Sequence, residues 1–397
     1  MSAVTDTPAP WPLPGWVPYP EDAAERYREL GLWTGATLDE LLREAVAARP
    51  DGLAVVAEDA RLDYAGLDAR VDALAVGLAG QGIERGDRVV VQLPNVAAFV
   101  VTVFALWRLG ALPVFALPAH GRMEIEHFCR HAGAVGYVTG GTHAGDDRLQ
   151  AAAALADDLE LRLTAIHAPA GPLPHGLVDL AEVEAAGVGA TAPTRAAHPG
   201  DVAFLQLSGG TTGTPKLIPR THDDYLFSVR ESARICDLDE TSVLLVALPV
   251  AHNFAMSSPG ILGAIAARGT IVLAADPSAA TVLRLVETER ATIVPAVPAL
   301  AVAWLNSAEA RTADLSSLRV LQVGGARLAD AIARRIAPEW GCTLQQVFGM
   351  AEGLVNYTRL DDDLETITTT QGLRISRYDE VRVVDDDDEP LPPGTPG

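Results

Sequence analysis

The chain has 397 residues, of which 49% are hydrophobic, and this length exceeds the size at which a single hydrophobic core keeps growing. Its 52 acidic and 30 basic residues give a net charge of −22, which argues against a nucleic acid or an anionic membrane surface as the partner. The three cysteines, Cys129, Cys236 and Cys342, lie far apart without metal or disulfide spacing, so each is expected inside a core.

Helix and strand patterns alternate along the first half of the chain. Thr37 and Glu40 form a capping box that predicts a helix from residue 38. Further helices are predicted at residues 67–78, ending near Gly82, and from residue 96 to about residue 109; strands are predicted at residues 53–57, 88–93 and 112–117. Such alternation is typical of a parallel, doubly wound sheet.

No part of the sequence indicates export or membrane insertion. The most apolar stretch, residues 96–106, is too short to span a bilayer and is followed by Arg108. The N-terminus has no signal-peptide pattern. We therefore expect a cytoplasmic protein with no membrane partner.

The alternation loosens between residues 140 and 199 and then resumes. We expect a first α/β subdomain over residues 1–195, including an N-terminal wrap, and a second over residues 196–370. Strands are predicted at residues 163–167, 202–207, 243–248, 270–273, 292–295 and 319–323, and a helix at residues 280–289. The acidic run at residues 385–389 predicts a solvated turn within a final segment, residues 371–397.

The string SGGTTGTPK at residues 208–216 suits a loop that wraps phosphate. It follows the apolar run 202–207; glycines let backbone N–H groups turn toward an anion, hydroxyls add donors, and lysine adds charge. It is not a Walker A motif, because Pro215 precedes Lys216 and Leu217 follows it. An ordinary surface turn is the alternative, but nine residues in this order after a strand favour the phosphate loop.

Four further strings contain candidate site residues. These are PVAHNF at 249–254, QVGGA at 322–326, QQVFGMAEG at 345–353 and NYTRLDD at 356–362. The first follows a predicted strand, where open α/β sheets bind ligands, and the second ends in a glycine pair that lets a flat ring approach the backbone. The third holds one carboxylate, Glu352, suited to a hard cation. Taken singly, each could be a structural turn or a solvated loop.

Together these strings resemble the adenylate-forming (ANL) superfamily of acyl- and aryl-CoA synthetases, luciferases and adenylation domains of nonribosomal peptide synthesis. From about residue 15 to the end, the chain is similar to the stand-alone aryl-acid adenylating enzymes typified by 2,3-dihydroxybenzoate–AMP ligase. The resemblance implies two doubly wound α/β subdomains packed together, plus the start of a small β-barrel at residues 371–397. It also implies activation of a hydroxylated aryl acid with ATP, giving an aryl adenylate and pyrophosphate for an aryl carrier protein in siderophore or related biosynthesis.

The resemblance assigns the ATP site and the catalytic groups. Lys216, His252 and Glu352 would be the catalytic residues, and Glu352 and Thr212 would hold Mg²⁺. The residues that would bind ATP are Ser208, Gly209, Gly210, Thr211, Thr212, Gly213, Lys216, Gly324, Gly325, Ala326, Val347, Phe348 and Gly349. No protein nucleophile is needed, because a carboxylate is already ionised at neutral pH.

The resemblance also assigns the aryl pocket. Asn253 would hydrogen-bond the ring hydroxyl ortho to the carboxylate. The remaining residues of the pocket would be Phe254, Ser258, Ala326, Val347 and Val355. Ser258 favours 2,3-dihydroxybenzoate, whereas Phe254, often a tyrosine in such enzymes, leaves open salicylate or a different 3-hydroxylated ring such as a hydroxypicolinate or hydroxyanthranilate. An aryl-CoA ligase and a non-catalytic binding module are the other interpretations.

The family pattern continues beyond residue 397 with a ribose-binding aspartate and a mobile domain that carries a lysine. The expectation from this difference is a chain that binds ATP and the aryl acid but catalyses poorly.

Overall fold

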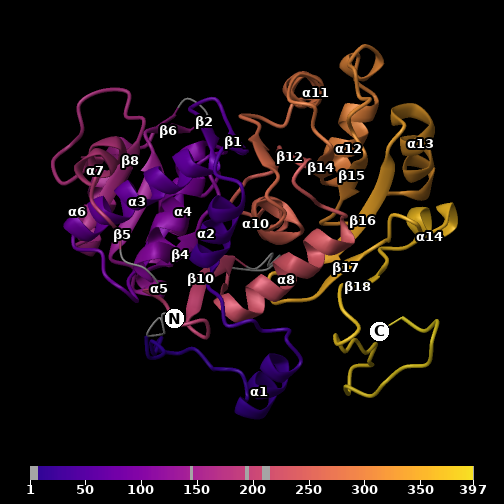
Figure 1. Ribbon diagram of the computed structural model, residues 1–397, viewed down its shortest axis with the longest axis horizontal. Coiled ribbons are helices and arrows are strands. Elements are labelled where there is room, and N and C mark those ends of the chain that lie inside the picture. Colours follow the sequence, from indigo (N-terminus) through magenta and orange to yellow (C-terminus); the bar gives the residue numbers. More distant parts are fainter. Residues whose placement is uncertain (1–7, 144–145, 193–195, 208–214, 397) are drawn as a thin grey trace.

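The computed structural model describes residues 8–143, 146–192, 196–207 and 215–396. Its strands form two large, mostly parallel sheets that lie side by side in Figure 1, with helices packed on and between them. The helix α1 and the segment after β18 lie below both sheets.

The helices alternate with the strands, as the sequence predicts. The helices are α1 (Glu21–Glu29), α2 (Leu38–Ala48), α3 (Tyr64–Gly80), α4 (Ala97–Leu109), α5 (Arg122–Ala132), α6 (Leu149–Leu159), α7 (Leu180–Ala186), α8 (His222–Ile235), α9 (Asn253–Ser257), α10 (Gly260–Ala266), α11 (Ala279–Thr288), α12 (Pro298–Leu305), α13 (Asp330–Trp340) and α14 (Leu364–Thr369), with one 3₁₀ turn, η1 (Glu309–Arg311). The capping box at Thr37 and Glu40 is confirmed at the start of α2.

The seven-stranded sheet has the order β11-β10-β4-β3-β5-β8-β9. Its strands are β3 (Arg88–Gln92), β4 (Leu112–Phe115), β5 (Gly136–Gly140), β8 (Leu163–His167), β9 (Val178–Asp179), β10 (Val202–Leu207) and β11 (Leu217–Thr221). All neighbouring pairs are parallel except β10 and β11. The short strands β6 (Thr142–His143) and β7 (Asp146–Asp147) pair separately.

The nine-stranded sheet has the order β18-β17-β16-β15-β14-β12-β13-β1-β2. Its strands are β1 (Leu53–Val56), β2 (Arg61–Asp63), β12 (Val243–Val246), β13 (Thr270–Leu273), β14 (Ile293–Ala296), β15 (Val320–Val323), β16 (Thr343–Gly349), β17 (Val355–Tyr357) and β18 (Leu373–Arg374). The six strands from β16 to β1 are parallel neighbours, so their carboxyl ends meet at one edge.

The two sheets exchange strands across residue 195. β1 and β2 come from the first part of the chain but join the nine-stranded sheet, and β10 and β11 join the seven-stranded one. The division into subdomains at residues 195 and 370 stays a prediction. So does the small β-barrel: in residues 371–396, β18 adds to the sheet edge, and Val384 and Pro390 form an isolated bridge around the acidic turn.

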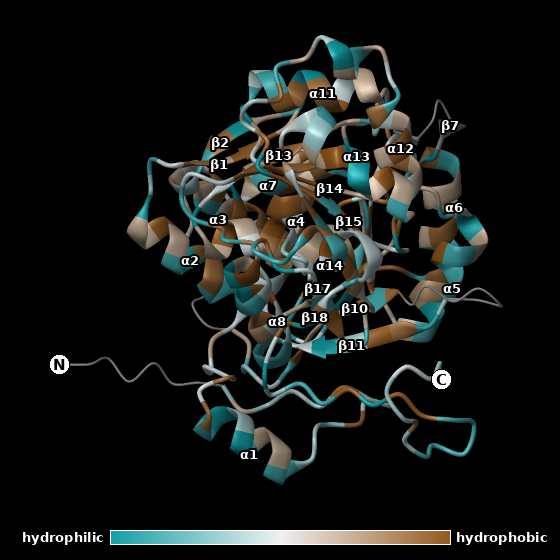
Figure 2. Ribbon diagram, turned by 90° about the vertical axis from the view of Figure 1, so that its right-hand side faces the viewer, coloured by the Kyte–Doolittle hydropathy of each residue, from teal (hydrophilic) through white to brown (hydrophobic). Residues whose placement is uncertain are grey.

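The apolar stretch noted at residues 96–106 is the central helix α4. All thirteen of its residues are buried, including Arg108, and its brown ribbon lies near the centre of Figure 2. The Arg108 guanidinium binds the carboxylates of Asp39, Asp68 and Asp72 at 2.6–2.8 Å, which satisfies this buried cation. Among the described helices, none is both long and apolar enough to cross a bilayer.

A buried histidine links helices α2 and α8. His222, the first residue of α8, accepts a hydrogen bond through Nδ1 from the backbone N–H of Leu38, 3.1 Å away. Burial lowers the pKa of His222 from 6.5 to about 4, so the imidazole is neutral in the folded protein. The unfolded chain therefore binds more protons than the folded chain between these two pH values.

We expect the folded chain to lose stability as the pH is lowered, because His222 resists protonation in the folded state. Between pH 7 and pH 5 the unfolded imidazole is protonated while His222 in the folded state stays neutral, which costs about 2 kcal/mol. Denaturant unfolding at both pH values should show a loss that is smaller by about 2 kcal/mol in His222→Gln than in the native chain. An equal loss in the two proteins would contradict the prediction, because the remaining histidines are common to both.

Candidate active site

The candidate site residues follow three parallel strands of the nine-stranded sheet. The segments after β12, β15 and β16 contain Asn253, Gly324 and Glu352 respectively. Because these strands are parallel and lie within four sheet positions of each other, the segments share one edge (Figure 1). The parallel order thus assembles residues that are up to 99 positions apart in the sequence.

The predicted phosphate loop connects β10 to β11. Ser208, Gly209, Gly210, Thr211, Thr212 and Gly213 lie outside the described residues, so their roles stay predictions. The two strands that flank the loop pair in antiparallel fashion, with Leu207 opposite Leu217. This pairing places Lys216, whose side chain is exposed, at the mouth of the hairpin next to the loop.

One amide fixes the segment after β12. The Asn95 Nδ2 donates to the carbonyls of Leu248, 2.9 Å away, and Ala274, 3.1 Å away, while its Oδ1 accepts from the N–H of Val250 at 2.8 Å. These contacts join the start of α4 to the strand ends from which the segment 249–254 leaves. Sequence reasoning missed Asn95, although its place after Pro94 at a strand end was visible.

His252 begins helix α9. It is the N-cap residue, and its Nδ1 accepts from the N–H of Phe254 at 3.2 Å. Surrounding protein lowers the pKa of the imidazole, although part of the side chain is exposed. His252 is therefore neutral at neutral pH, with Nε2 free of the cap interaction.

Asn253 is held by a residue that sequence reasoning missed. The Tyr225 hydroxyl on α8 donates to Asn253 Oδ1 at 2.8 Å. Tyr225 is fully buried, whereas Asn253 is half-buried. The contact could not be foreseen, because the two residues are 28 positions apart on different elements.

Phe254 and Gly324 touch. A Cβ atom added to Gly324 would lie 2.8 Å from Cε1 of the Phe254 ring, closer than real Cβ contacts. The glycine after β15 is therefore required by the side chain of Phe254, and its predicted role at the adenine of ATP stays a prediction. Gly325 adopts φ +80°, and both it and Ala326 are exposed.

The β16–β17 hairpin presents two faces. Val347 and Val355 are buried and belong to the same core cluster as Phe254 and Tyr225. Phe348 and Gly349 are exposed, and Gly349 pairs with Val355 across the hairpin. Three residues predicted for the aryl pocket, Phe254, Val347 and Val355, thus belong to one buried cluster, whereas Phe348 and Gly349, predicted for adenine, are exposed.

Ser258 is more deeply buried than His252 and Asn253. It follows α9, is only 3% exposed, and its N–H donates to the carbonyl of Phe254 at 3.3 Å. Burial raises the pKa of the Tyr357 phenol, and the nearby hydroxyls of Ser232 and Ser258 act in the opposite direction. Ser258 is therefore close to the phenol of Tyr357, in the interior behind the hairpin.

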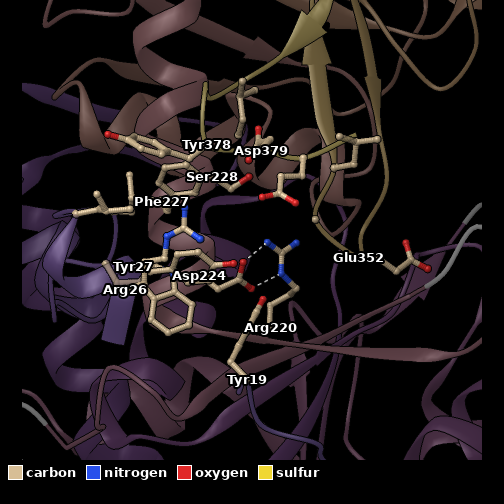
Figure 3. A pocket seen from close by; sticks show the side chains of 17 residues that line it. Tyr19, Arg26, Tyr27, Arg220, Asp224, Phe227, Ser228, Glu352, Tyr378 and Asp379 are labelled. Carbon is tan, nitrogen blue, oxygen red and sulfur yellow. Dashed lines mark hydrogen bonds and ion pairs between the residues drawn. The ribbon is translucent and has the colours of Figure 1, made fainter. Parts of the chain in front are cut away.

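Glu352 lies in the turn between β16 and β17, beside a cavity of about 470 Å³ (Figure 3). Its carboxylate is exposed and points away from Arg220. The Arg220 guanidinium, itself buried, donates to Asp224 at 2.8 Å and to the carbonyl of Ala351 at 2.7 Å. Of the predicted site residues that the structure describes, only Glu352 lines this cavity, so the cavity does not contain the residues predicted to bind the aryl acid.

The chain matches known proteins over most of its length. A family model described as "AMP-binding enzyme" matches residues 42–397. The 2,3-dihydroxybenzoate-AMP ligase of Bacillus subtilis is 47% identical over 97% of this chain and 70% of its own length. A Mycobacterium tuberculosis protein named salicyl-AMP ligase / salicyl-S-ArCP synthetase is 45% identical over 97% of this chain and 68% of its own length. The apo structure of Mycobacterium smegmatis MbtA superposes with a TM-score of 0.87 at 42% identity, covering 96% of this chain and 69% of that one.

We expect Gly324→Ala to destabilise the chain by about 1–3 kcal/mol, because the added methyl group overpacks the site against Phe254. In a Phe254→Leu background, the same substitution should cost at least about 1 kcal/mol less, since the ring edge is gone. Denaturant unfolding of the four proteins measures this coupling. Gly80→Ala is the control, because an added Cβ meets nothing within 4 Å there. An equal cost of Gly324→Ala in both backgrounds would show that the ring is not the obstacle.

Proposed function

Because this chain belongs to the AMP-binding enzyme family, we propose that it activates a hydroxylated aryl carboxylic acid with ATP. A carboxylate oxygen of the acid attacks the α-phosphorus of ATP, the bond to the β-phosphate bridge oxygen breaks, and aryl adenylate and pyrophosphate are the products. The relatives named as 2,3-dihydroxybenzoate- and salicyl-AMP ligases support this reaction, since each matches 97% of the chain. The chain is thus an ATP-dependent adenylating ligase.

The observation that carries the choice of acid is the position of Asn253. Its half-buried amide is the polar group next to a cluster of buried apolar side chains, Phe254, Val347 and Val355. A flat ring fits against such a cluster, and a hydroxyl ortho to the carboxylate would satisfy the amide. An acid without that hydroxyl would leave the amide unpaired, so the contact gives strong discrimination.

A contact to a second ring hydroxyl, at position 3, would distinguish 2,3-dihydroxybenzoate from salicylate. Ser258, which follows Ser257 at the end of α9 and lies next to the phenol of Tyr357, would bind a 3-hydroxyl. This favours 2,3-dihydroxybenzoate over salicylate. The name of the Bacillus subtilis relative supports the same choice.

Two anions must meet in the reaction, so the site must supply positive charge and fixed geometry. Lys216 supplies a cation beside the predicted phosphate loop. The neutral imidazole of His252 can donate or accept one hydrogen bond through Nε2 near the reacting groups without adding charge. Gly325 and Ala326, with Phe348 and Gly349, are the exposed residues assigned to adenine, and Gly324 lies buried beside them.

Glu352 fits the role of a Mg²⁺ ligand. Its carboxylate is an exposed hard oxygen donor, and no hydrogen bond or ion pair to other described residues engages it. Among the described residues there is no group of three or more His, Cys, Asp or Glu side chains that could cage a metal. Phosphate oxygens, water and the predicted ligand Thr212 would complete the coordination, and the ion would neutralise phosphate charge.

The adenylate is a reactive mixed anhydride and requires an acceptor. We propose the phosphopantetheine thiol of an aryl carrier protein, as the name of the Mycobacterium tuberculosis relative suggests. Siderophore biosynthesis or a related natural-product pathway is the corresponding context.

We expect thermal shifts to identify the substrate class. With ATP and Mg²⁺ present, 2,3-dihydroxybenzoate and salicylate should raise the unfolding midpoint and benzoate should not, because a ligand bound only by the folded state stabilises it. Asn253→Ala should remove the difference between salicylate and benzoate, whereas Asn306→Ala, at an exposed asparagine, should retain it. ATP–pyrophosphate exchange should depend on the same acids. No response to any hydroxylated acid would overturn the proposed function.

A further inference from the structure

We propose that Tyr225 is a positioning residue that orients the Asn253 amide, so that its Nδ2 hydrogens and not its carbonyl oxygen face the bound acid. The inference rests on the proposed function and deepens it, because it fixes which ortho substituents the site accepts. It is carried by the hydrogen bond from the Tyr225 hydroxyl to Asn253 Oδ1, 2.8 Å long, between a buried phenol and a half-buried amide.

The phenol is held rigidly. The Tyr225 ring meets Phe204 edge to face, with 4.5 Å between ring centroids and 71° between planes. The Arg220 guanidinium also lies over the ring, 5.0 Å from its centroid, and Arg220 is fixed in turn by Asp224 and the carbonyl of Ala351. A side chain packed in this way has one available direction for its hydroxyl group.

The phenol is also a fixed donor. Burial raises the pKa of Tyr225 above its ordinary value, so the hydroxyl keeps its proton at neutral pH. A phenol has one proton to donate, and here Asn253 Oδ1 receives it. With its oxygen engaged, the amide can offer only N–H groups to a ligand.

One alternative arrangement reverses this polarity. Ser257 lies close to the Tyr225 hydroxyl, so the phenol proton could turn to Ser257 while a reversed Asn253 donates to the phenol oxygen. Asn253 would then present its carbonyl oxygen to the acid. The Ser257 hydroxyl already donates to the backbone carbonyl of Asn253 at 3.5 Å, a long contact that leaves Ser257 free to accept. The two arrangements predict opposite substrate preferences.

A donor at Asn253 selects aryl acids with an acceptor in the ortho position. A phenolic oxygen can accept from Nδ2 while it donates its own proton to the neighbouring carboxylate. An ortho amino group cannot, because its lone pair is delocalised into the ring and its N–H groups would face the N–H groups of Asn253. The site therefore accepts 2-hydroxyaryl acids and rejects 2-aminoaryl acids of nearly the same shape.

The test compares salicylate with 2-aminobenzoate in the presence of ATP and Mg²⁺. Calorimetric titration of the unaltered chain should give a dissociation constant for salicylate lower by about tenfold or more. In Tyr225→Phe the amide is free to rotate, so the ratio of the two constants should fall to within about threefold of one. A purely structural role for Tyr225 would weaken both acids equally and leave the ratio unchanged.

Tyr64→Phe is the matched control. Tyr64 is also fully buried, and its hydroxyl donates to the carbonyl of Gly269 at 2.8 Å, away from the candidate site. It should lose similar stability to Tyr225→Phe and keep the salicylate preference. An unchanged preference in a folded Tyr225→Phe protein overturns the inference and leaves the proposed function intact.

A second variant keeps the inference testable if Tyr225→Phe does not fold. Asn253→Asp presents a carboxylate, with one oxygen bound by Tyr225 and the other facing the acid, and should reverse the preference toward 2-aminobenzoate. Failure of this reversal, or a preference of the unaltered chain for 2-aminobenzoate, overturns the inference. If the unaltered chain binds no hydroxylated acid, the proposed function fails and this inference fails with it.

Discussion

A single amide side chain, Asn95, connects the two halves of the molecule at the edge where the candidate site is built. It lies between β3 of one sheet and the central helix α4, and it binds the strand ends of the other sheet. Buried backbone groups that have left a strand need partners, and Asn95 supplies them without water. The segment that contains His252 and Asn253 therefore leaves its strand from a backbone position that Asn95 fixes.

The interior supports the same point. Helix α4 is apolar on all sides because both of its faces are buried, and Asp59 accepts hydrogen bonds from its first N–H groups at Ala97 and Ala98. The single cation in this helix, Arg108, binds three carboxylates drawn from α2 and α3. Arg108 thereby holds helices α2 and α3 against α4, although they are separated from it by tens of residues in the sequence. A site on loops gains its precision from such a scaffold.

The sequence predicts much of this structure and misses identifiable parts of it. Strands and helices could be assigned because apolar periodicity is local, and the edge that bears the site follows from parallel order. Strand exchange between the sheets could not be predicted, since the partners of β1 and β10 are chosen by distant segments. The same limit applies to the site: Asn253 and Phe254 stand in recognisable strings, but Asn95 and Tyr225 act across long separations, and the contact of Phe254 with Gly324 depends on packing. The residues of the phosphate loop are predicted from sequence alone.

Arg220 has a mechanical consequence. It belongs to β11, a few residues after Lys216. Its guanidinium donates a hydrogen bond to the carbonyl of Ala351, next to Glu352, in the hairpin of the other sheet. Lys216 and Glu352, both assigned to the phosphate end of the nucleotide, are thus connected through the buried side chain of Arg220. If one sheet slid past the other, the hydrogen bond from Arg220 to Ala351 would break. Conformational adjustments during turnover must therefore come from loop rearrangement, while the two sheets stay fixed.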